Sequence, residues 1–479
     1  MNYPSIPFTF AKRHGIIFSQ PNTIYHRPDI TQQILIEVRR FLSIPLSFQA
    51  ISPEQFDLLL TKNYEATSSQ MMEGLGDELD LSQVAKQLAE PEDLLETADD
   101  APIIRLINAL LSEAIKENAS DIHIEPFETR LVVRFRTDGV LREILQPRRV
   151  LAPLLISRIK VMAKLDIAEK RLPQDGRISL RIAGRAVDVR VSTIPSGHGE
   201  RVVLRLLDKQ AGRLDLQQIG MSTDILIHLR NLLEKVYGVL MVTGPTGSGK
   251  TTSLYGMLNY LNDHSRNIMT VEDPIEYYLD GIAQTQVNTK VNMTFARGLR
   301  AILRQDPDVV MVGEIRDVET AQIAIQASLT GHLVLSTLHT NTAIGAITRL
   351  RDMGIEPFLL ASSIIGLMSQ RLVRLLCQHC KQVYIPNAVE MRELKLTTAP
   401  ELYKAQGCSN CNSIGYLGRT GIYELVSIDS TLRNMIHDSV GQHELENYVN
   451  TQSIYQDATK RLLAGDTTVD ELLRVIKDR

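Results

Sequence analysis

The spacing of apolar residues along the chain changes in character several times. From Ile103 to Ile115 they recur with the 3.6-residue period of an amphipathic helix. Strand-like runs follow at 121–125 and 130–135, and residues 177–207 alternate between apolar and polar positions. This mixture of a helix and antiparallel-type strands predicts an α+β domain over residues 103–208.

From about Gly220 onward, short apolar strands alternate with segments of helical pattern. The strands are expected at four places, namely 238–243, 267–272, 309–315 and 332–338. Such alternation predicts a parallel sheet flanked by helices, which is an α/β fold. The region from 423 to 479 has a helical pattern, and we take it as a helical C-terminal subdomain.

The first hundred residues are less regular. Residues 1–90 mix short apolar clusters with loops and contain no motif, whereas residues 91–100 gather five acidic side chains. We interpret 91–102 as an acidic linker. A chain of 479 residues that is 44% hydrophobic is too long for one core, and we expect two to four domains.

Composition narrows the functional classes. The chain has 56 acidic and 52 basic residues and 5% aromatic residues, which gives no overall basic field and few stacking platforms for nucleic acid. A nucleic-acid translocase is therefore disfavoured. The start of the chain lacks a signal-peptide pattern, and the longest near-apolar run, 357–368, is broken by two serines, so we expect neither export nor a membrane span.

A phosphate loop follows the first predicted strand of the α/β region and opens a helix, which is the context that such a loop requires. Its glycines let backbone amides turn toward phosphates, its lysine reaches them as a point charge, and the following threonine offers a hydroxyl to Mg²⁺. The predicted nucleotide-binding residues are Gly244, Pro245, Thr246, Gly247, Ser248, Gly249, Lys250, Thr251 and Thr252.

Two further strands end in carboxylates. The apolar run that starts at Val309 leads to Glu314, which we predict to be the base that activates water, or to hold Mg²⁺ through a water molecule. The strand that ends at Glu272 delivers a second acid that could face the same metal site. Which carboxylate activates the water stays open at this point.

Histidines and arginines supply further candidates. His332 and His339 bracket a strand, and a histidine at a strand end can bind a phosphate or position a carboxylate, although either could equally be a core or capping residue. Arginines could stabilise the charge that develops on the phosphates in the transition state, although an isolated arginine more often forms a surface ion pair. The candidates are Arg190, Arg201, Arg205, Arg316 and Arg349.

Four cysteines occur as two close pairs, Cys377 with Cys380 and Cys408 with Cys411. In a reducing compartment this spacing indicates a zinc site, although the gap between the pairs exceeds the roughly 15 to 20 residues of a zinc ribbon. Four thiolates leave no open coordination position, so one structural Zn²⁺ per chain is predicted. His379 lies inside the first pair and is interpreted as a bystander.

Taken together, these motifs resemble the type II/type IV secretion ATPase superfamily. The phosphate loop is followed in order by an acidic box at 270–277, a second one at 306–317 and a histidine box at 330–341. Three further segments resemble the branch of this superfamily that contains secretion ATPase E and the pilus-extension ATPases. They are Ala119 to Pro126, Arg171 to Arg177 and Gly418 to Glu424. The resemblance covers residues 100–479.

The resemblance implies a RecA-like P-loop ATPase core at 220–370, a tetracysteine zinc subdomain at 371–422, and a PAS-like α+β domain before them. It implies catalytic roles for Glu272, Glu314 and His339 beside bound ATP and Mg²⁺. It also implies a homo-hexamer in which Arg190 and Arg205 approach the phosphates.

The family also implies a role. A tetracysteine subdomain and a single N-terminal domain of about 90 residues resemble secretion E proteins, which favours a type II secretion motor over the alternative of a pilus-extension ATPase. Residues 1–90 would then bind the cytoplasmic domain of the inner-membrane L protein, with the platform F protein as a second partner. The protein would be cytoplasmic and peripheral on the inner membrane. A scaffold that binds ATP without useful turnover is a further alternative.

Overall fold

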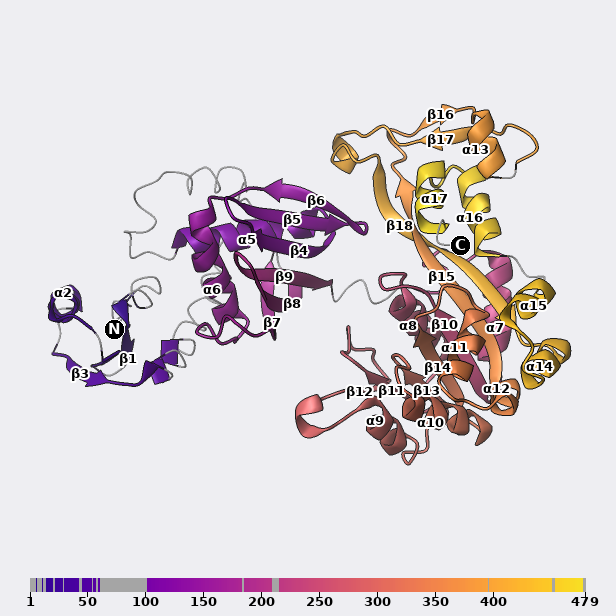
Figure 1. Cartoon of the computed structure of the whole chain (residues 1–479), viewed down its shortest axis with the longest axis horizontal. Coiled ribbons are helices and arrows are strands. Elements are labelled where there is room, and N and C mark those ends of the chain that lie inside the picture. The colour runs from indigo at the N-terminus through magenta and orange to yellow at the C-terminus, as the bar shows by residue number, and fades with distance from the viewer. Residues whose placement is uncertain are drawn as a thin grey trace. The chain divides into compact units, whose positions relative to one another are not determined.

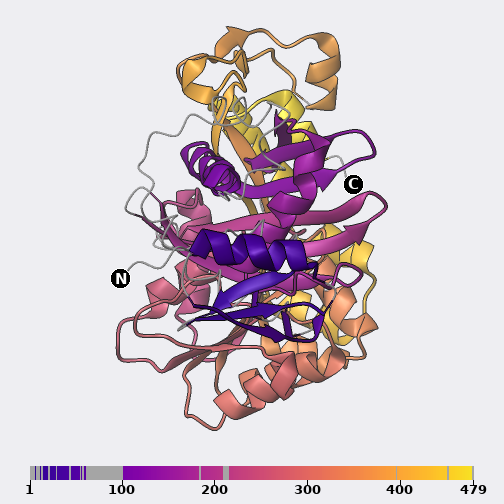
Figure 2. The ribbon, with the colours of Figure 1, turned by 90° about the vertical axis from the view of Figure 1, so that its left-hand side faces the viewer.

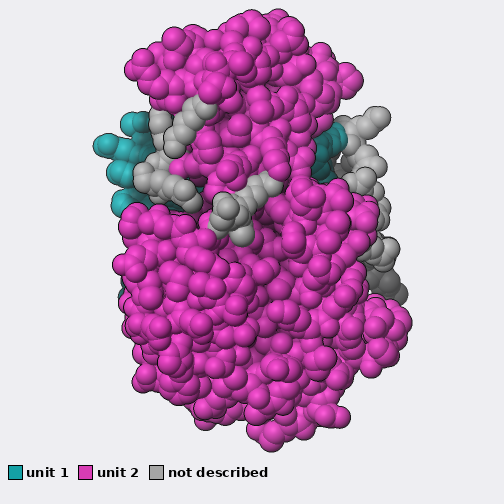
Figure 3. Space-filling model, turned by 90° about the vertical axis from the view of Figure 1, so that its right-hand side faces the viewer, with its two compact units in different colours: residues 1–209 teal, residues 210–479 magenta. Residues whose placement is uncertain are grey.

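The computed structural model describes residues 101–182, 185–208, 215–394, 396–449 and 453–476, together with shorter stretches between residues 6 and 60. The chain divides into two compact units, 1–209 and 210–479 (Figure 3). Residues 91–100 of the predicted linker lie outside the described residues, and residue 101 already begins a helix. Among the described residues, no helix combines the length and the apolar character needed to cross a bilayer.

The N-terminal part of unit 1 contains a small sheet in the order β1-β2-β3 (Ile16–Ser19, Thr23–His26, Ser47–Ala50). Strand β2 runs antiparallel to β1 and parallel to β3. Helix α2 (Gln32–Leu42) buries Val38 and Leu42 in the same core as the strand residues Ile16 and Ile24 (Figure 2). A crossover helix between parallel strands is the usual way to make such a connection.

The rest of unit 1 is built on a six-stranded antiparallel sheet in the order β6-β5-β4-β9-β8-β7. One face packs against helices α5 (Ala101–Lys116) and α6 (Ala152–Met162) in a single apolar core (Figure 1). The short helix η1 (Arg149–Leu151) precedes α6. This is the α+β domain that the sequence predicts. Its strands are β4 Ala119–Pro126, β5 Leu131–Thr137, β6 Val140–Leu145, β7 Gln174–Ile182, β8 Arg185–Ser196 and β9 Gly199–Asp208.

Unit 2 is centred on a seven-stranded sheet in the order β12-β11-β13-β14-β10-β15-β18, in which only the β15–β18 pair is antiparallel. The strands of its centre are buried at every position, as expected for a parallel sheet that is covered on both faces. The α/β prediction is confirmed. The strands are β10 Gly238–Thr243, β11 Ile268–Glu272, β12 Ala283–Gln286, β13 Val309–Val312, β14 Leu333–Leu338, β15 Ile364–Leu376 and β18 Tyr416–Ser427.

Helices cover this sheet on both faces and form two separate cores. One core includes helices α7 and α8, and the other includes α9 to α12. The near-apolar run at 357–368 divides at its serines into helix α12 and the start of strand β15. The helices are α7 Thr223–Leu233, α8 Lys250–Leu261, α9 Phe295–Ile302, α10 Val318–Leu329, α11 Gly345–Asp352 and α12 Pro357–Ser363, with a short helix η3 at Thr289–Val291.

The C-terminal third adds a small subdomain and four helices. Strand β15 continues past residue 370, where we predicted the end of the ATPase core, and leads to the first cysteine pair. Helices α14 and α15 contribute to the α9–α12 core, whereas α16 and α17 pack with the tetracysteine subdomain. The elements are β16 Gln382–Tyr384, α13 Ala388–Glu393, β17 Leu402–Lys404, η4 Ser409–Cys411, α14 Ser430–His437, α15 Gln442–Tyr448, α16 Ile454–Leu463 and α17 Val469–Ile476.

Candidate nucleotide site and tetracysteine site

The predicted phosphate loop connects the buried strand β10 to helix α8. Gly244, Gly247 and Gly249 have φ values of 148°, 79° and 87°, a region that side chains with a Cβ rarely adopt. At Gly244 a Cβ would also lie 2.5 Å from the carbonyl oxygen of Gln370. The glycines are therefore required by the turn and by the close approach of strand β15.

Lys250 begins helix α8 and is only 9% exposed. Its Nζ donates hydrogen bonds to the carbonyl oxygens of Gly244, at 2.8 Å, and Pro245, at 3.0 Å. Burial lowers the pKa of Lys250 to about 8, and the nearby charge of Glu314 opposes this shift. The ammonium group is thus folded over the loop, close to the predicted base.

Glu314 follows strand β13 by two residues. Its carboxylate forms an ion pair with Arg316 and lies 3.4 Å from Nε2 of His339, with 15% of the side chain exposed. The backbone is fixed on both sides, because the Gly313 amide donates to Val271 and the Ile315 amide donates to Thr337. The structure therefore brings together Glu314, His339 and Arg316 at the carboxyl ends of adjacent strands.

Glu272 ends strand β11 and is 3% exposed. Its carboxylate accepts hydrogen bonds from Thr270 Oγ1 at 2.5 Å and Gln284 Nε2 at 3.0 Å, and also from the hydroxyl of Tyr255. Burial, together with the charge of Glu272, raises the pKa of Tyr255, which keeps its phenol a donor. Glu272 is thus held by three donors from α8, β11 and β12.

The remaining candidates differ in their surroundings. Nδ1 of His332 lies 2.8 Å from the Ala327 carbonyl oxygen at the end of α10, so this histidine caps a helix at the amino end of β14. Arg349 is exposed on helix α11.

The candidate arginines of unit 1 lie on the face of the six-stranded sheet opposite its helices. Arg190 is directly opposite Arg205 on the neighbouring strand, and Arg205 is opposite Asp121, to which its Nε donates at 2.8 Å. Arg201 forms an ion pair with Glu125 at 2.6 Å. Since the phosphate loop belongs to unit 2, these arginines and Lys250 lie in different units.

Three residues that contact the phosphate loop or Glu272 were not found from the sequence: Tyr255, Gln284 and Gln370. Ser253 Oγ on helix α8 donates to Gln370 Oε1 at 2.8 Å. All three are common residue types outside any motif. The order of strands brings Gln284 to Glu272 and Gln370 to the loop, whereas Tyr255 reaches Glu272 from helix α8.

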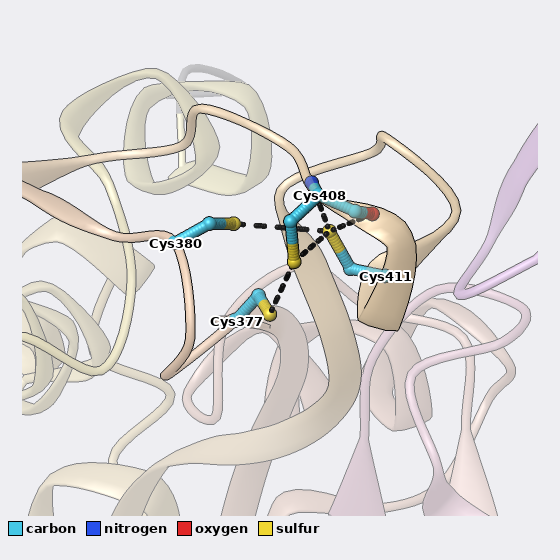
Figure 4. A group of neighbouring side chains, drawn as sticks. All are labelled: Cys377, Cys380, Cys408 and Cys411. Atoms are coloured by element: carbon cyan, nitrogen blue, oxygen red, sulfur yellow. Dashed lines mark hydrogen bonds between the residues drawn. The ribbon is translucent and has the colours of Figure 1, made fainter.

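The four cysteines converge although the two pairs are far apart in sequence (Figure 4). All four Sγ atoms lie within 4.8 Å of one another, and three of the separations are 3.9, 3.8 and 3.8 Å. A tetrahedron with Zn–S bonds of about 2.3 Å has S–S edges of about 3.8 Å, so this donor set fits Zn²⁺. His379, which lies between the first two, is exposed.

Hydrogen bonds to sulfur support a thiolate site. The backbone amides of Cys408 and Gly415 donate to Cys411 Sγ at 3.2 and 3.1 Å. Although burial opposes the charge, these amides help to lower the pKa of Cys411 to about 6. The thiolate is the form of cysteine that binds a metal.

A covered parallel sheet, a glycine loop after its strand β10 and a lysine at the start of the following helix together define a P-loop ATPase fold. A family model described as "Type II/IV secretion system protein" matches residues 96–474, and a second model, for a domain of "GSPII protein E", matches residues 5–64. The chain belongs to this secretion family, and within it to the family of type II secretion system protein E.

Individual relatives agree with this. The chain is 60% identical over 483 residues to type II secretion system protein E of Pseudomonas aeruginosa, which covers 99% of this chain and 96% of the relative. It is 57% identical over 488 residues to type II secretion system ATPase E of Vibrio cholerae, and the match covers 99% of this chain and 97% of that relative. Among solved structures, the crystal structure of the pilus retraction motor PilT with bound ADP superposes on this chain with a TM-score of 0.52 and 27% sequence identity. The match covers 76% of this chain and 95% of PilT.

Proposed function

We propose that this chain is the ATP-hydrolysing motor of a type II secretion system, which powers pseudopilus assembly and protein export across the outer membrane. The observation that carries the proposal is the convergence of Lys250, at the phosphate loop, with Glu314, which is held by Arg316 and His339. Relatives named for type II secretion, with 57–60% identity along nearly the whole chain, support the biological setting.

In this proposal the loop amides and Lys250 bind the phosphates of ATP. The present partners of Lys250 are two neutral carbonyl oxygens, and a charged phosphate is a stronger acceptor. Thr251, exposed in the first turn of α8, offers its hydroxyl to Mg²⁺, which when bound would neutralise phosphate charge. Glu314 accepts a proton from the attacking water, while Arg316 and His339 fix its orientation.

Glu314 and Glu272 would have different catalytic roles, because their surroundings differ. Glu314 is partly exposed and contacts Arg316 and His339, which suits a group that must reach a water molecule. Glu272 is buried and bound by three donors, so it would act as a fixed negative charge beside the metal. We therefore assign the base to Glu314 and electrostatic support to Glu272.

Full activity would need a closed ring. Arg190 and Arg205 lie on an exposed sheet face of unit 1, from which they could reach phosphates bound to unit 2 of the same or a neighbouring chain. A homo-hexamer supplies such neighbours, and an isolated chain would hydrolyse ATP slowly. The single Zn²⁺ would be structural, because four thiolates complete its coordination.

The proposed location is the cytoplasmic face of the inner membrane. Residues 1–90 would bind the cytoplasmic domain of the L protein, and the platform F protein would be the second partner. The match of residues 5–64 to a domain of protein E of this secretion family supports this assignment of the N-terminal part.

The test uses the full-length chain with Mg²⁺ and ATP. Phosphate release is measured alone, with the cytoplasmic domain of the L protein, and with its pilus counterpart, beside Lys250→Ala and Glu314→Gln. Selective binding and stimulation by the L domain support the secretion motor, whereas stimulation by the pilus component indicates pilus extension. A Glu314→Gln chain that retains secretion in cells would instead indicate a scaffold that needs no turnover.

A further inference from the structure

Strand β15 borders the phosphate loop. It runs parallel to β10 with Thr243 opposite Ser369, so the next residues of β15 continue beside the loop. A Cβ added at Gly244 would lie 2.5 Å from the carbonyl oxygen of Gln370. A Cβ added at Gly249 would lie 2.8 Å from Nε2 of the same glutamine. Both ends of the loop thus contact this one residue.

The residue after Gln370 is a partly exposed arginine. Arg371 Nη2 donates to the carbonyl oxygen of Asn341, at 3.0 Å, and Nη1 donates to that of Gln370, at 3.2 Å. Asn341 is two residues beyond His339, which contacts Glu314. The guanidinium therefore lies between the phosphate loop and the loop that carries the histidine beside the proposed base.

Two independent features place anion-binding chemistry here. Together with burial, the positive charge of Arg371 contributes to lowering the pKa of Lys250, so the two cations are near each other. Ser248 is 4% exposed, and its Oγ has no hydrogen-bond partner among the described residues. Two cations near each other, Lys250 and Arg371, and the unsatisfied hydroxyl of Ser248 border the phosphate loop and make a site that an anion would stabilise.

We propose that Arg371 binds the terminal phosphate of ATP from within the same subunit and couples its presence to the histidine loop through Asn341. A phosphate offers charged oxygens that suit the planar guanidinium fork of Arg371. Because Asn341 adjoins the His339 and Glu314 side of the site, Arg371 would sense the terminal phosphate more than the inner ones. This inference rests on the proposed ATP site at Lys250.

A purely structural role is the competing explanation, in which Arg371 only ties the histidine loop to β15. That role predicts equal losses of affinity for nucleotides with and without the terminal phosphate. A phosphate contact predicts unequal losses, because only one nucleotide carries the group that Arg371 binds.

The experiment measures the binding of ADP and of a non-hydrolysable ATP analogue, each with Mg²⁺, by calorimetry on the full chain. Arg371→Gln should weaken binding of the ATP analogue about tenfold, or about 1.4 kcal/mol, with a change in ADP binding of about twofold or less. Arg371→Lys, which keeps the charge but not the fork, should restore part of the loss. Arg392→Gln, an exposed arginine on α13, is the control for charge and should bind both nucleotides as wild type does.

Equal weakening of both nucleotides, or no weakening, overturns the proposal. If the wild-type chain binds neither nucleotide, the proposed ATP site is overturned as well. Lys250→Ala in the same series separates a failure of the ATP site from a failure of the Arg371 contact. If Arg371→Gln lowers the unfolding temperature, Arg371→Lys is compared with wild type instead. A ratio of ATP-analogue affinity to ADP affinity that is the same in Arg371→Lys and in wild type likewise overturns the phosphate contact.

Discussion

Glu471 in helix α17 provides the clearest quantitative prediction. Its carboxylate is 0% exposed and accepts hydrogen bonds from the Arg374 amide and from the guanidinium groups of Arg374 and Arg474, at 2.6–3.0 Å. Although burial opposes ionisation, these hydrogen bonds lower the pKa of Glu471 from 4.5 to about 2. At about 1.4 kcal/mol per pKa unit, this corresponds to roughly 3 kcal/mol that favours the folded state.

Glu471→Gln should therefore reduce the free energy of local opening of α17 by about 3 kcal/mol at pH 7, since it leaves the partly buried Arg374 without its charged partner. The assay is hydrogen exchange at the amides of α17 and β15, which reports local opening separately from the other domains. Glu444→Gln, at an exposed position of α15, is the matched control and should have no measurable effect.

The pH dependence of Glu471 has a defined sign. A carboxyl group with a lowered pKa in the folded protein contributes its full stability above the pKa of the unfolded chain and loses it as the pH falls toward the folded value. The wild-type advantage over Glu471→Gln should thus be constant above about pH 5 and decline between about 4.5 and 2. A difference below about 0.5 kcal/mol at pH 7, or one that grows on acidification, would refute the reasoning.

Three further outcomes are expected. Glu314→Gln should lower the rate of phosphate release by about 10² or more while ATP still binds, since it removes the proposed base, and a smaller loss in steady-state assays would reassign that role. Gly244→Ala should abolish nucleotide binding in calorimetry, because its Cβ would meet the Gln370 backbone; wild-type affinity would contradict this. Cys408→Ser should lose the metal and unfold the tetracysteine subdomain while nucleotide binding persists, and unchanged metal content by mass spectrometry would exclude this account.

Local sequence patterns were sufficient for the parts of the site that are determined within one element. The glycine loop follows its strand directly, and the apolar run before Glu314 identifies strand β13, although the strand was predicted at 309–315 and ends at Val312. These features depend on chain geometry over a few residues, so the sequence alone predicts them. The same holds for the two cysteine pairs, whose short internal spacing is characteristic of metal ligands.

Contacts that depend on strand order could not be predicted in this way. Gln284 reaches Glu272 only because β12 lies next to β11, and Gln370 reaches the phosphate loop only because β15 lies next to β10. Neither pairing follows from residue spacing, since crossover connections decide which strands become neighbours. Arg371 was missed for the same reason.

Strand β15 also explains why loss of the metal should leave the nucleotide site intact. The strand passes the phosphate loop at Gln370 and ends at Leu376, immediately before the predicted metal ligand Cys377. Near the loop it is hydrogen-bonded on both sides, to β10 as far as Ser369 and to β18 along most of its length. Beyond Ser369 it is held by β18, by the small apolar core shared with α16 and α17, and by the hydrogen bonds between Arg374 and Glu471. Strand β18 pairs with β15 at Gln370 itself and onward to Arg374. Loosening that begins at the cysteines must therefore break this pairing before it reaches the residue that contacts Gly244, and the two sites should fail separately.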